Sequence, residues 1–316
     1  MVKRRMAIIA LLISFCFLLL PCYATAASTA DASEPINLRK DCTLTLSYAC
    51  NGTAFEDITV NLYKIATVSE DFQYTLTTRF DSTKLILNGV KTNGEWNVIR
   101  STLEARIVAD SIAADNVVKT DSKGLVCFEN LKPALYLAVV GTTSKDALSC
   151  RFESALIALP NLNTDGSWQY QVDVVTKSEI IPPSQQEVEL KVLKLWKGDK
   201  ESSNRPKNIE VEIFRDGTSY KKVVLSNDNN WSYSWKTNED GAKWTVIERN
   251  TPEGYIMTLE DRDNAFVLTN SYVPENPDLP PDIPQTGDTF NFSLYVILMI
   301  ASGCLLIILG IVGKRK

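Results

Sequence analysis

Apolar and polar residues alternate along most of residues 188–273, which is the pattern of β-strands that bury one face. The alternation is clearest in 188–196, 231–235, 244–248 and 266–272. Turn residues such as Asp216-Gly217 separate these segments. Short strands with turn signals at this spacing predict a β-sandwich.

Residues 27–180 have a mixed pattern. Segments 43–49, 58–65 and 170–175 are predicted strands. In contrast, Trp96, Ile99, Leu103 and Ile107 recur at helical spacing, which predicts an amphipathic helix over 95–113 packed on a sheet. The linker 181–187 contains Pro182-Pro183 and divides this part from residues 188–273. The predicted fold class is therefore mainly β, with two β-sandwich, Ig-like modules in tandem and a helix added to the first.

Both ends of the chain are apolar segments beside short basic clusters. Residues 1–26 have a basic start, an apolar stretch and a small-residue cleavage site, which is typical of a secretory signal peptide. A membrane anchor is the alternative, but the apolar stretch is shorter than the roughly 20 residues that a span needs. Residues 290–312 are long and apolar enough to span a bilayer, and the tail 313–316 is basic, so we expect the tail to stay cytoplasmic.

Composition excludes several functions. The chain has no histidine, which rules out every histidine-based triad, general base or metal site. Residues 27–286 carry more acidic than basic side chains, which disfavours nucleic-acid binding. Neither a GxSxG nucleophile motif nor a phosphate-binding GxxxxGK[ST] loop is present. We therefore expect no enzyme activity on a separate substrate, no metal and no other cofactor.

Four cysteines lie between the two ends: Cys42, Cys50, Cys127 and Cys150. An even number in an exported protein predicts two disulfides. If 42–50 is one unbroken strand, its ends lie roughly 26 Å apart, far beyond the limit of about 7 Å for bridged Cα atoms. The pair Cys42–Cys50 is therefore disfavoured, and the two other pairing schemes stay open. A four-cysteine zinc site is the alternative, but no CxxC pair is present.

Before the C-terminal apolar segment stands the pentapeptide Ile283-Pro284-Gln285-Thr286-Gly287, preceded by a Pro-rich spacer over 274–282. With the apolar span and basic tail, it resembles the LPXTG-type sorting signal of Gram-positive surface proteins, with Ile in the Leu position. The resemblance implies that sortase attacks the carbonyl between Thr286 and Gly287. Sortase then joins Thr286 to an amine of a peptidoglycan precursor or another pilin. An ordinary single-pass membrane protein is the alternative.

A second pattern lies at the end of the first module. Trp168, Val172, Val174 and Lys177 resemble the WxxxVxVxPK motif of sortase-polymerised pilins, except that Thr176 replaces the proline. In that family the lysine is the amine that joins subunits, so the resemblance implies this role for Lys177. The alternative is a solvated lysine at the end of a strand.

One lysine falls on the inward side of a predicted strand. Lys194 shares its phase with Val192 and Trp196, and alternation likewise turns Glu248 and Asn270 inward. Burial disfavours charge, so the amine of Lys194 should be neutral and nucleophilic and the carboxyl of Glu248 protonated. Attack of this amine on the Asn270 carboxamide, with Glu248 relaying protons, would release ammonia and leave an amide cross-link.

Residues 188–273 resemble the collagen-adhesin B-type (Cna-B) domain. Among the segments that carry the resemblance are Lys194-Leu-Trp196, Arg205-Pro206 and Leu268-Thr-Asn270. The resemblance implies the same intramolecular isopeptide bond between Lys194 and Asn270, with Glu248 as the assisting carboxyl. The alternatives are a buried Lys–Glu ion pair beside an amide, or a lysine that reaches solvent at a strand edge.

Together these features predict a protein exported to the Gram-positive cell surface and anchored covalently to the wall. The expected role is an accessory or basal pilus subunit or a stalked adhesin, whose partners are sortase, peptidoglycan precursor and other pilins. A host or cell-surface ligand is not identified by the sequence. A membrane-retained single-pass receptor and a wall-anchored enzyme of unseen mechanism are the alternatives.

Overall fold

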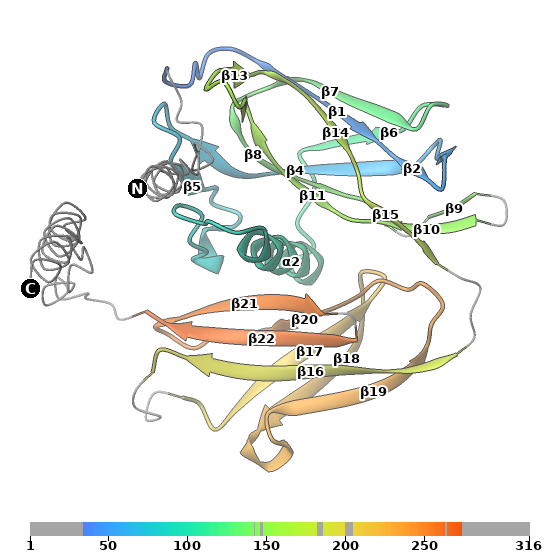
Figure 1. Cartoon of the computed structure of the whole chain (residues 1–316). Coiled ribbons are helices and arrows are strands. Elements are labelled where there is room, and N and C mark those ends of the chain that lie inside the picture. Colours follow the sequence, from blue (N-terminus) through green and yellow to red (C-terminus); the bar gives the residue numbers. More distant parts are fainter. Residues whose placement is uncertain are drawn as a thin grey trace, which may run out of the picture. The chain divides into compact units, whose positions relative to one another are not determined.

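A computed structural model describes residues 34–141, 143–145, 148–181, 186–199, 205–262 and 264–273 (Figure 1). Within these ranges, no helix is both long and apolar enough to cross a membrane. The predicted signal peptide, spacer, sorting motif, membrane span and basic tail lie outside the described residues, as do residues 182–185 of the predicted linker. The described elements before Val273 belong to one compact unit.

The described residues are mainly β, as predicted. The first part of the chain contains β1 (Cys42–Ser47), β2 (Ala49–Cys50), β3 (Thr53–Ala54), β4 (Thr59–Val68), β5 (Tyr74–Leu76), η1 (Asp81–Thr83), α2 (Asn93–Ala109), β6 (Asn116–Lys119), β7 (Leu125–Leu131), β8 (Ala134–Val139), β9 (Thr143–Lys145), β10 (Leu148–Phe152), β11 (Ala155–Leu159), β12 (Asn161–Leu162), β13 (Trp168–Gln169), β14 (Gln171–Val175) and β15 (Ser178–Ile181). The second part contains β16 (Glu187–Lys197), β17 (Asn208–Arg215), β18 (Thr218–Ser226), η3 (Asn227–Asn229), β19 (Ser232–Asn238), β20 (Trp244–Glu248), β21 (Tyr255–Arg262) and β22 (Ala265–Tyr272).

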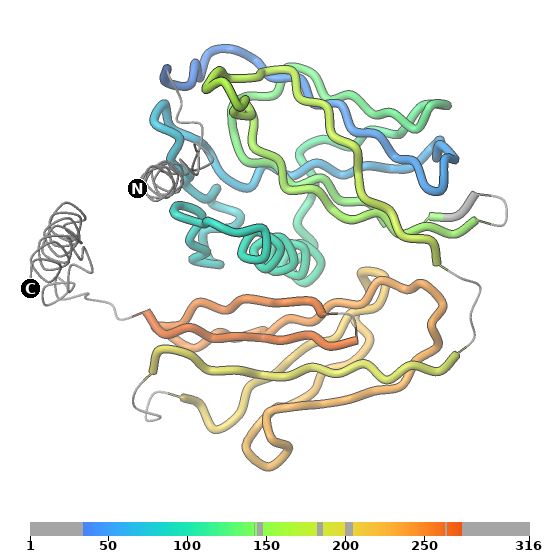
Figure 2. The backbone as a smooth tube through the Cα atoms, viewed as in Figure 1, coloured from blue at the N-terminus to red at the C-terminus, as the bar shows by residue number. Residues whose placement is uncertain are grey.

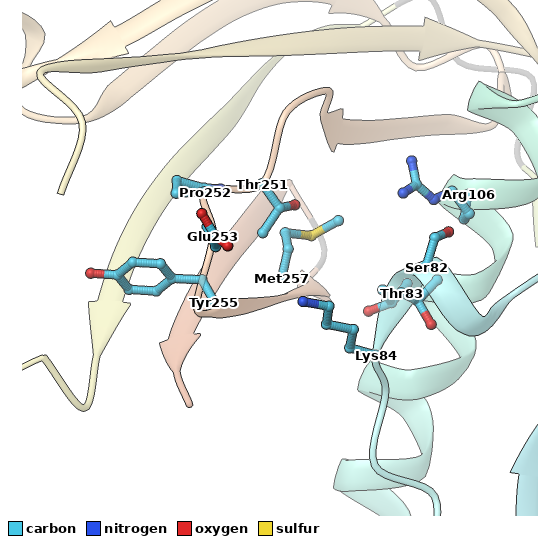
Figure 3. Close-up of a pocket in the computed structure, with 10 residues that line it drawn as sticks. Ser82, Thr83, Lys84, Arg106, Thr251, Pro252, Glu253, Tyr255 and Met257 are labelled. Atoms are coloured by element: carbon cyan, nitrogen blue, oxygen red, sulfur yellow. The ribbon is translucent and has the colours of Figure 1, made fainter. Parts of the chain in front are cut away.

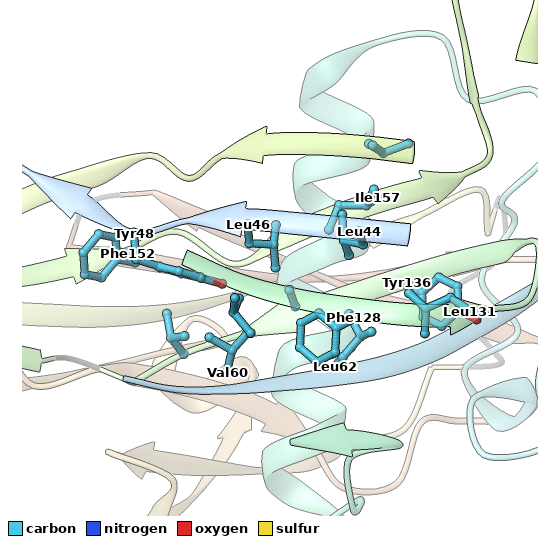
Figure 4. Close-up of a cluster of buried hydrophobic side chains, with 14 of the residues drawn as sticks. Leu44, Leu46, Tyr48, Val60, Leu62, Phe128, Leu131, Tyr136, Phe152 and Ile157 are labelled. Atoms are coloured by element: carbon cyan, nitrogen blue, oxygen red, sulfur yellow. The ribbon is translucent and has the colours of Figure 1, made fainter. Parts of the chain in front are cut away.

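The first part is built from sheets that enclose a common core. One sheet has the order β14-β1-β7, with β1 and β14 parallel, and a larger one has the order β11-β8-β4-β5, with β6 also paired to β4. Smaller sheets have the order β15-β10-β9 and the pairs β12-β13 and β2-β3. Figure 4 shows side chains of β1, including Leu44 and Leu46, gathered with Val60, Leu62 and Phe128 in the buried cluster. The predicted strands 43–49, 58–65 and 170–175 correspond to β1 with β2, β4 and β14.

The second part is a pair of sheets. Their strand orders are β19-β16-β22-β21 and β18-β17-β20. Strands β16 and β22, far apart in sequence, lie side by side (Figure 2) and are parallel. The alternate residues Leu190, Val192 and Lys194 of β16 are buried, whereas Glu189 and Lys191 are exposed. The predicted period-two burial therefore holds along this strand.

The predicted helix over 95–113 is confirmed as α2, which begins two residues earlier and ends four residues earlier. Its start is fixed by a capping box. The Glu95 N–H donates to the Thr92 hydroxyl (3.2 Å), and the Thr92 N–H donates to the Glu95 carboxylate (2.9 Å). It ends early because Ser111, with φ of 50°, turns the backbone into the left-handed region.

Two opposite sides of α2 are buried, which explains why its amphipathicity is weak. Ile99 and Leu103 belong to a cluster with Tyr63 of β4 and Leu137 of β8. Ala105 belongs instead to the core of the second pair of sheets. The Leu259 N–H of edge strand β21 donates to the Thr102 hydroxyl oxygen (2.8 Å), so the helix covers this sheet edge.

Replacing Thr102 by Val is expected to destabilise the protein by about 1–3 kcal/mol, because the buried N–H of Leu259 loses its acceptor while the side-chain shape is kept. The measurement is the free energy of unfolding of residues 34–273 in urea. Thr102→Ser keeps the hydroxyl and serves as the control, with a smaller loss expected. Equal stability of Thr102→Val and the unsubstituted protein would contradict this assignment.

Candidate functional site

Three polar side chains meet inside the second pair of sheets. Lys194 comes from β16, Asn270 from the neighbouring parallel strand β22, and Glu248 from the end of β20 in the facing sheet. Trp196 lies opposite Asn270 in the β16–β22 register, so Lys194 and Asn270 are two positions apart on the same inward side. The structure brings together the three residues that alternation turns inward.

Glu248 bridges the other two side chains. The Lys194 Nζ lies 2.6 Å from Glu248 Oε2, and Asn270 Nδ2 donates to Glu248 Oε1 at 3.1 Å. The side chains of Lys194 and Glu248 have no exposed surface, and Asn270 is fully buried. A lysine that reaches solvent at a strand edge is therefore excluded. The other alternative, a buried ion pair of Lys194 and Glu248 beside the Asn270 amide, agrees with these contacts.

The pKa of the Lys194 amine is set mainly by burial. Desolvation lowers the pKa of its amine from 10.5 to about 8, although the carboxylate of Glu248 acts in the opposite direction. Asn270 Oδ1 is buried and has no hydrogen-bond partner among the described residues. An unsatisfied buried carbonyl is costly and uncommon, and it lies on the amide that an amine nucleophile would attack.

The part of the chain that holds these three residues is similar to a known domain family. The model of the Cna protein B-type domain matches residues 190–271, which include Lys194, Glu248 and Asn270. Residues 190–271 form a Cna protein B-type domain. A collagen adhesin of Staphylococcus aureus is 31% identical to this chain over 104 residues, which are 30% of this chain and 9% of that protein. The chain thus matches only a small part of that relative's length.

Solved structures of bacterial surface proteins are also similar. A single B repeat unit of the collagen-binding surface protein of S. aureus has a TM-score of 0.26 at 15% identity, covering 73% of this chain and 97% of that one. The major pilin SpaD of Corynebacterium diphtheriae has a TM-score of 0.28 at 12% identity, covering 75% and 99%. The minor pilin GBS52 of Streptococcus agalactiae has a TM-score of 0.23 at 15% identity, covering 76% and 99%. With TM-scores this low, none of the three assigns a role to a residue of this chain.

Lys177 lies outside the Cna-B domain, two residues after the end of β14. Its side chain is 82% exposed, and its amine lies 3.6 Å from the carboxylate of Glu153. Thr176, which replaces the proline of the pilin motif, is buried. Its N–H and its hydroxyl both donate to the Ser47 carbonyl, at 3.1 and 2.7 Å. Proline has no N–H and no hydroxyl and could make neither hydrogen bond. Thr176 thus fixes the end of the strand just before the accessible Lys177.

The cysteines form one disulfide where two were predicted. Cys50 and Cys150 are bridged, with Cα atoms 6.6 Å apart, whereas Cys42 and Cys127 are free. The prediction of a second bridge is wrong because the two remaining thiols lie on opposite faces of one sheet. Cys42 is buried with the inward residues of β1, whereas Cys127 of β7 is exposed between the buried Val126 and Phe128. Burial raises the pKa of the Cys42 thiol to about 11, which keeps it protonated and unreactive.

A separate hollow lies between η1, α2 and the start of β21. Figure 3 shows Lys84 and Arg106 on one side of it and Thr251, Glu253 and Met257 on the other. Its lining does not include Lys194, Glu248 or Asn270. The two buried polar residues of its lining already have partners: the Thr102 hydroxyl accepts from the Leu259 N–H and donates to the Val98 carbonyl, and the Tyr255 hydroxyl donates to Asp199. They are therefore already engaged and do not serve as anchors for a ligand.

Several features of the site were missed by pattern analysis. Strand β21 was not predicted, although Tyr255, Met257 and Leu259 alternate with less buried residues and could have been found by period two. The ion pair between Asp199 and Arg205 was also missed, because the two residues are separated by a segment with no periodic pattern. Its contacts with the aromatic residues beside Lys194 are visible only in three dimensions.

Proposed function

We propose that this protein is anchored covalently to the Gram-positive cell wall and serves as an accessory or basal pilus subunit or a stalked adhesin. In this proposal the Cna-B domain is part of a stalk that a bond between Lys194 and Asn270 stabilises. The observation that carries the proposed bond is the buried contact of Lys194 with Glu248 at 2.6 Å and of Glu248 with Asn270 at 3.1 Å. The sorting-signal resemblance of residues 283–287 supports the anchoring.

The proposed bond forms by attack of the neutral Lys194 Nζ on Cγ of Asn270. The Nζ–Cγ bond forms, the Cγ–Nδ2 bond breaks, and ammonia leaves with the proton that the amine gives up. Burial favours this reaction because it lowers the pKa of Lys194 to about 8, so the neutral amine is more populated than in an exposed lysine. No cofactor or outside reactant is needed.

Glu248 is suited to move the proton. Its two oxygens contact the amine that loses a proton and the amide nitrogen that gains one, so a single carboxyl serves both. The orientation of the Asn270 amide decides which of its atoms faces Glu248. With the amide turned by half, Oδ1, which has no partner among the described residues, would face a Glu248 carboxyl carrying the proton given up by Lys194, and this hydrogen bond would polarise the carbonyl for attack. Rotation back to the present orientation would then let Nδ2 take that proton as it leaves.

The anchoring is tested by fractionation of cells that express the full chain. The expected result is release of the protein from peptidoglycan by muramidase and little protein in the detergent-soluble membrane fraction. Thr286→Ala should move the protein to the membrane fraction, whereas Gln285→Ala, at the variable position of the motif, should not. Wild-type protein found only in the membrane fraction would favour a membrane-retained receptor.

The role of Lys177 is tested by gel electrophoresis of wall extracts. Because its side chain is 82% exposed, a sortase-linked partner can reach the amine. If the chain is a polymerised subunit, SDS-resistant ladders are expected, and Lys177→Ala should abolish them. Lys119→Ala is the matched control, since Lys119 is another exposed lysine paired with an acidic residue. Ladders that persist in Lys177→Ala would show that another amine is used.

A further inference from the structure

A group of contacts closes the end of the Cna-B domain beside Lys194. Asp199 accepts hydrogen bonds from Arg205, through Nε and through Nη2 at 2.7 Å, and from the Tyr255 hydroxyl at 2.9 Å. The Asp199 side chain is only 3% exposed. The hydrogen bonds from Arg205 are the main reason that the pKa of Asp199 falls to about 2, so the ion pair persists at every physiological pH.

Trp196 connects this ion pair to the amine of Lys194. The Lys194 Nζ lies 4.7 Å from the centre of the indole ring, and the Arg205 guanidinium lies 5.7 Å from it. Tyr255 packs edge-on against the same ring, with centroids 5.2 Å apart. Trp196 is also directly opposite Asn270 in the β16–β22 register. The indole ring is therefore next to both groups that would react.

The Asp199–Arg205 ion pair connects parts of the chain that belong to different strands. They stand on the two sides of residues 200–204, so their contact joins the chain that leaves β16 to the chain that enters β17. Tyr255, at the start of β21, joins the same carboxylate to a third strand. Three strand ends are thus held around one indole ring.

We propose that the Asp199–Arg205 ion pair and Tyr255 hold Trp196 against Lys194 and so exclude water from the amine until it has attacked Asn270. Asp199, Arg205 and Tyr255 are positioning residues in this inference, because none of them touches the reacting atoms. The inference rests on the cross-linking reaction proposed above. Its physical basis is that water near the amine would favour the charged, non-nucleophilic form.

The test compares two double variants of the full chain, made by cell-free synthesis in detergent. Asp199→Asn with Arg205→Gln opens the ion pair without changing the net charge. Asp240→Asn with Arg215→Gln is the matched control, because Arg215 also pairs with an aspartate and lies 5.8 Å from the ring of Trp244. That pair sits at the other end of β20 from Glu248.

Two quantities are measured in each variant. The first is the rate at which proteolytic digests gain the branched peptide joining Lys194 to Asn270. The second is acetylation of Lys194 by acetic anhydride in an Asn270→Ala background, where the amine cannot react internally. Opening the ion pair is expected to slow cross-linking about tenfold, the effect of one unit of amine pKa on the neutral fraction. Labelling is done at a pH well above the pKa of the amine, so that it reports access of the reagent alone, and it is expected to increase severalfold. The control should match the unsubstituted chain in both.

Each outcome decides between the two proposals. If the unsubstituted chain never forms the branched peptide, the proposed function fails, and labelling still reports whether the amine is shielded. If the unsubstituted chain cross-links, but the Asp199/Arg205 variant cross-links at the same rate and its Lys194 is labelled no faster, the shielding role is wrong. Slow cross-linking with full protection would equally overturn it, because the pair would then act only on stability.

Tyr255→Phe provides a second test that does not depend on the double variant folding. It removes the hydroxyl that donates to Asp199 and keeps the ring that packs against Trp196. A smaller change in the same direction, in both rate and labelling, is expected. No change in either quantity would contradict the role of Tyr255.

Discussion

Replacement of Glu248 by Ala is expected to abolish the Lys194–Asn270 bond and to destabilise the protein strongly. The proposed bond would close a loop of roughly 75 residues, and a cross-link over such a loop is worth about 4.5 kcal/mol on the loop-closure relation. The substitution also leaves the buried amine of Lys194 without its carboxylate, which adds to the loss. For a protein of this size, the midpoint of thermal unfolding should fall by roughly 10 °C or more.

The control separates the reaction from general destabilisation. Glu212 is also a buried glutamate, and it pairs with Arg249 and accepts a hydrogen bond from Ser219. Glu212→Ala should lower stability because Arg249 loses its partner, yet the protein should still lose one ammonia. Thermal unfolding and intact mass are measured for both variants. A Glu248→Ala protein that still loses ammonia would contradict the role of this carboxyl.

Removal of the Cys50–Cys150 disulfide is expected to have an effect of similar size. The bridge joins β2 to β10 across a sequence separation of 100 residues, for which the loop-closure relation gives about 4–5 kcal/mol. The double variant Cys50→Ala/Cys150→Ala should therefore unfold roughly 10 °C lower than the oxidised protein. The measurement is calorimetry of residues 34–273 with and without a reducing agent.

The free cysteine Cys127 supplies the matched control. Its thiol is exposed and unbridged, so Cys127→Ser should change stability by less than about 0.5 kcal/mol. A reducing agent should destabilise Cys127→Ser as much as the unsubstituted protein, and should leave the Cys50/Cys150 variant unchanged. If reduction had no effect on the unsubstituted protein, the stabilising role of the bridge would be wrong.

The positions of the three site residues could be predicted because strand alternation is local. Val192 and Lys194 share one phase of β16, and Leu268 and Asn270 share one phase of β22, so burial of the apolar members carries the polar ones inward. The helix was also predictable, because Ile99, Leu103 and Ile107 recur at helical spacing. Its ends depended on the cap at Thr92 and on the backbone turn at Ser111.

Other features depend on which strands become neighbours, and a single sequence does not determine this. The pairing of Cys50 with Cys150 required the contact between β2 and β15 and the pairing of β15 with β10. The second buried side of α2 could not be anticipated, because Thr102 is polar and Ala105 is small, so the two do not mark a second apolar stripe. The contact between Asp199 and Arg205 at the domain end was not predicted either, because it also depends on which segments become neighbours.

The most direct test of the account is the intact mass of residues 34–273 after reduction, followed by peptide mapping. The proposed cross-link predicts a mass one ammonia below the sum of the residues, and a single branched peptide that joins Lys194 to Asn270. A mass equal to the full sum, with Lys194 and Asn270 recovered in separate linear peptides, would contradict it.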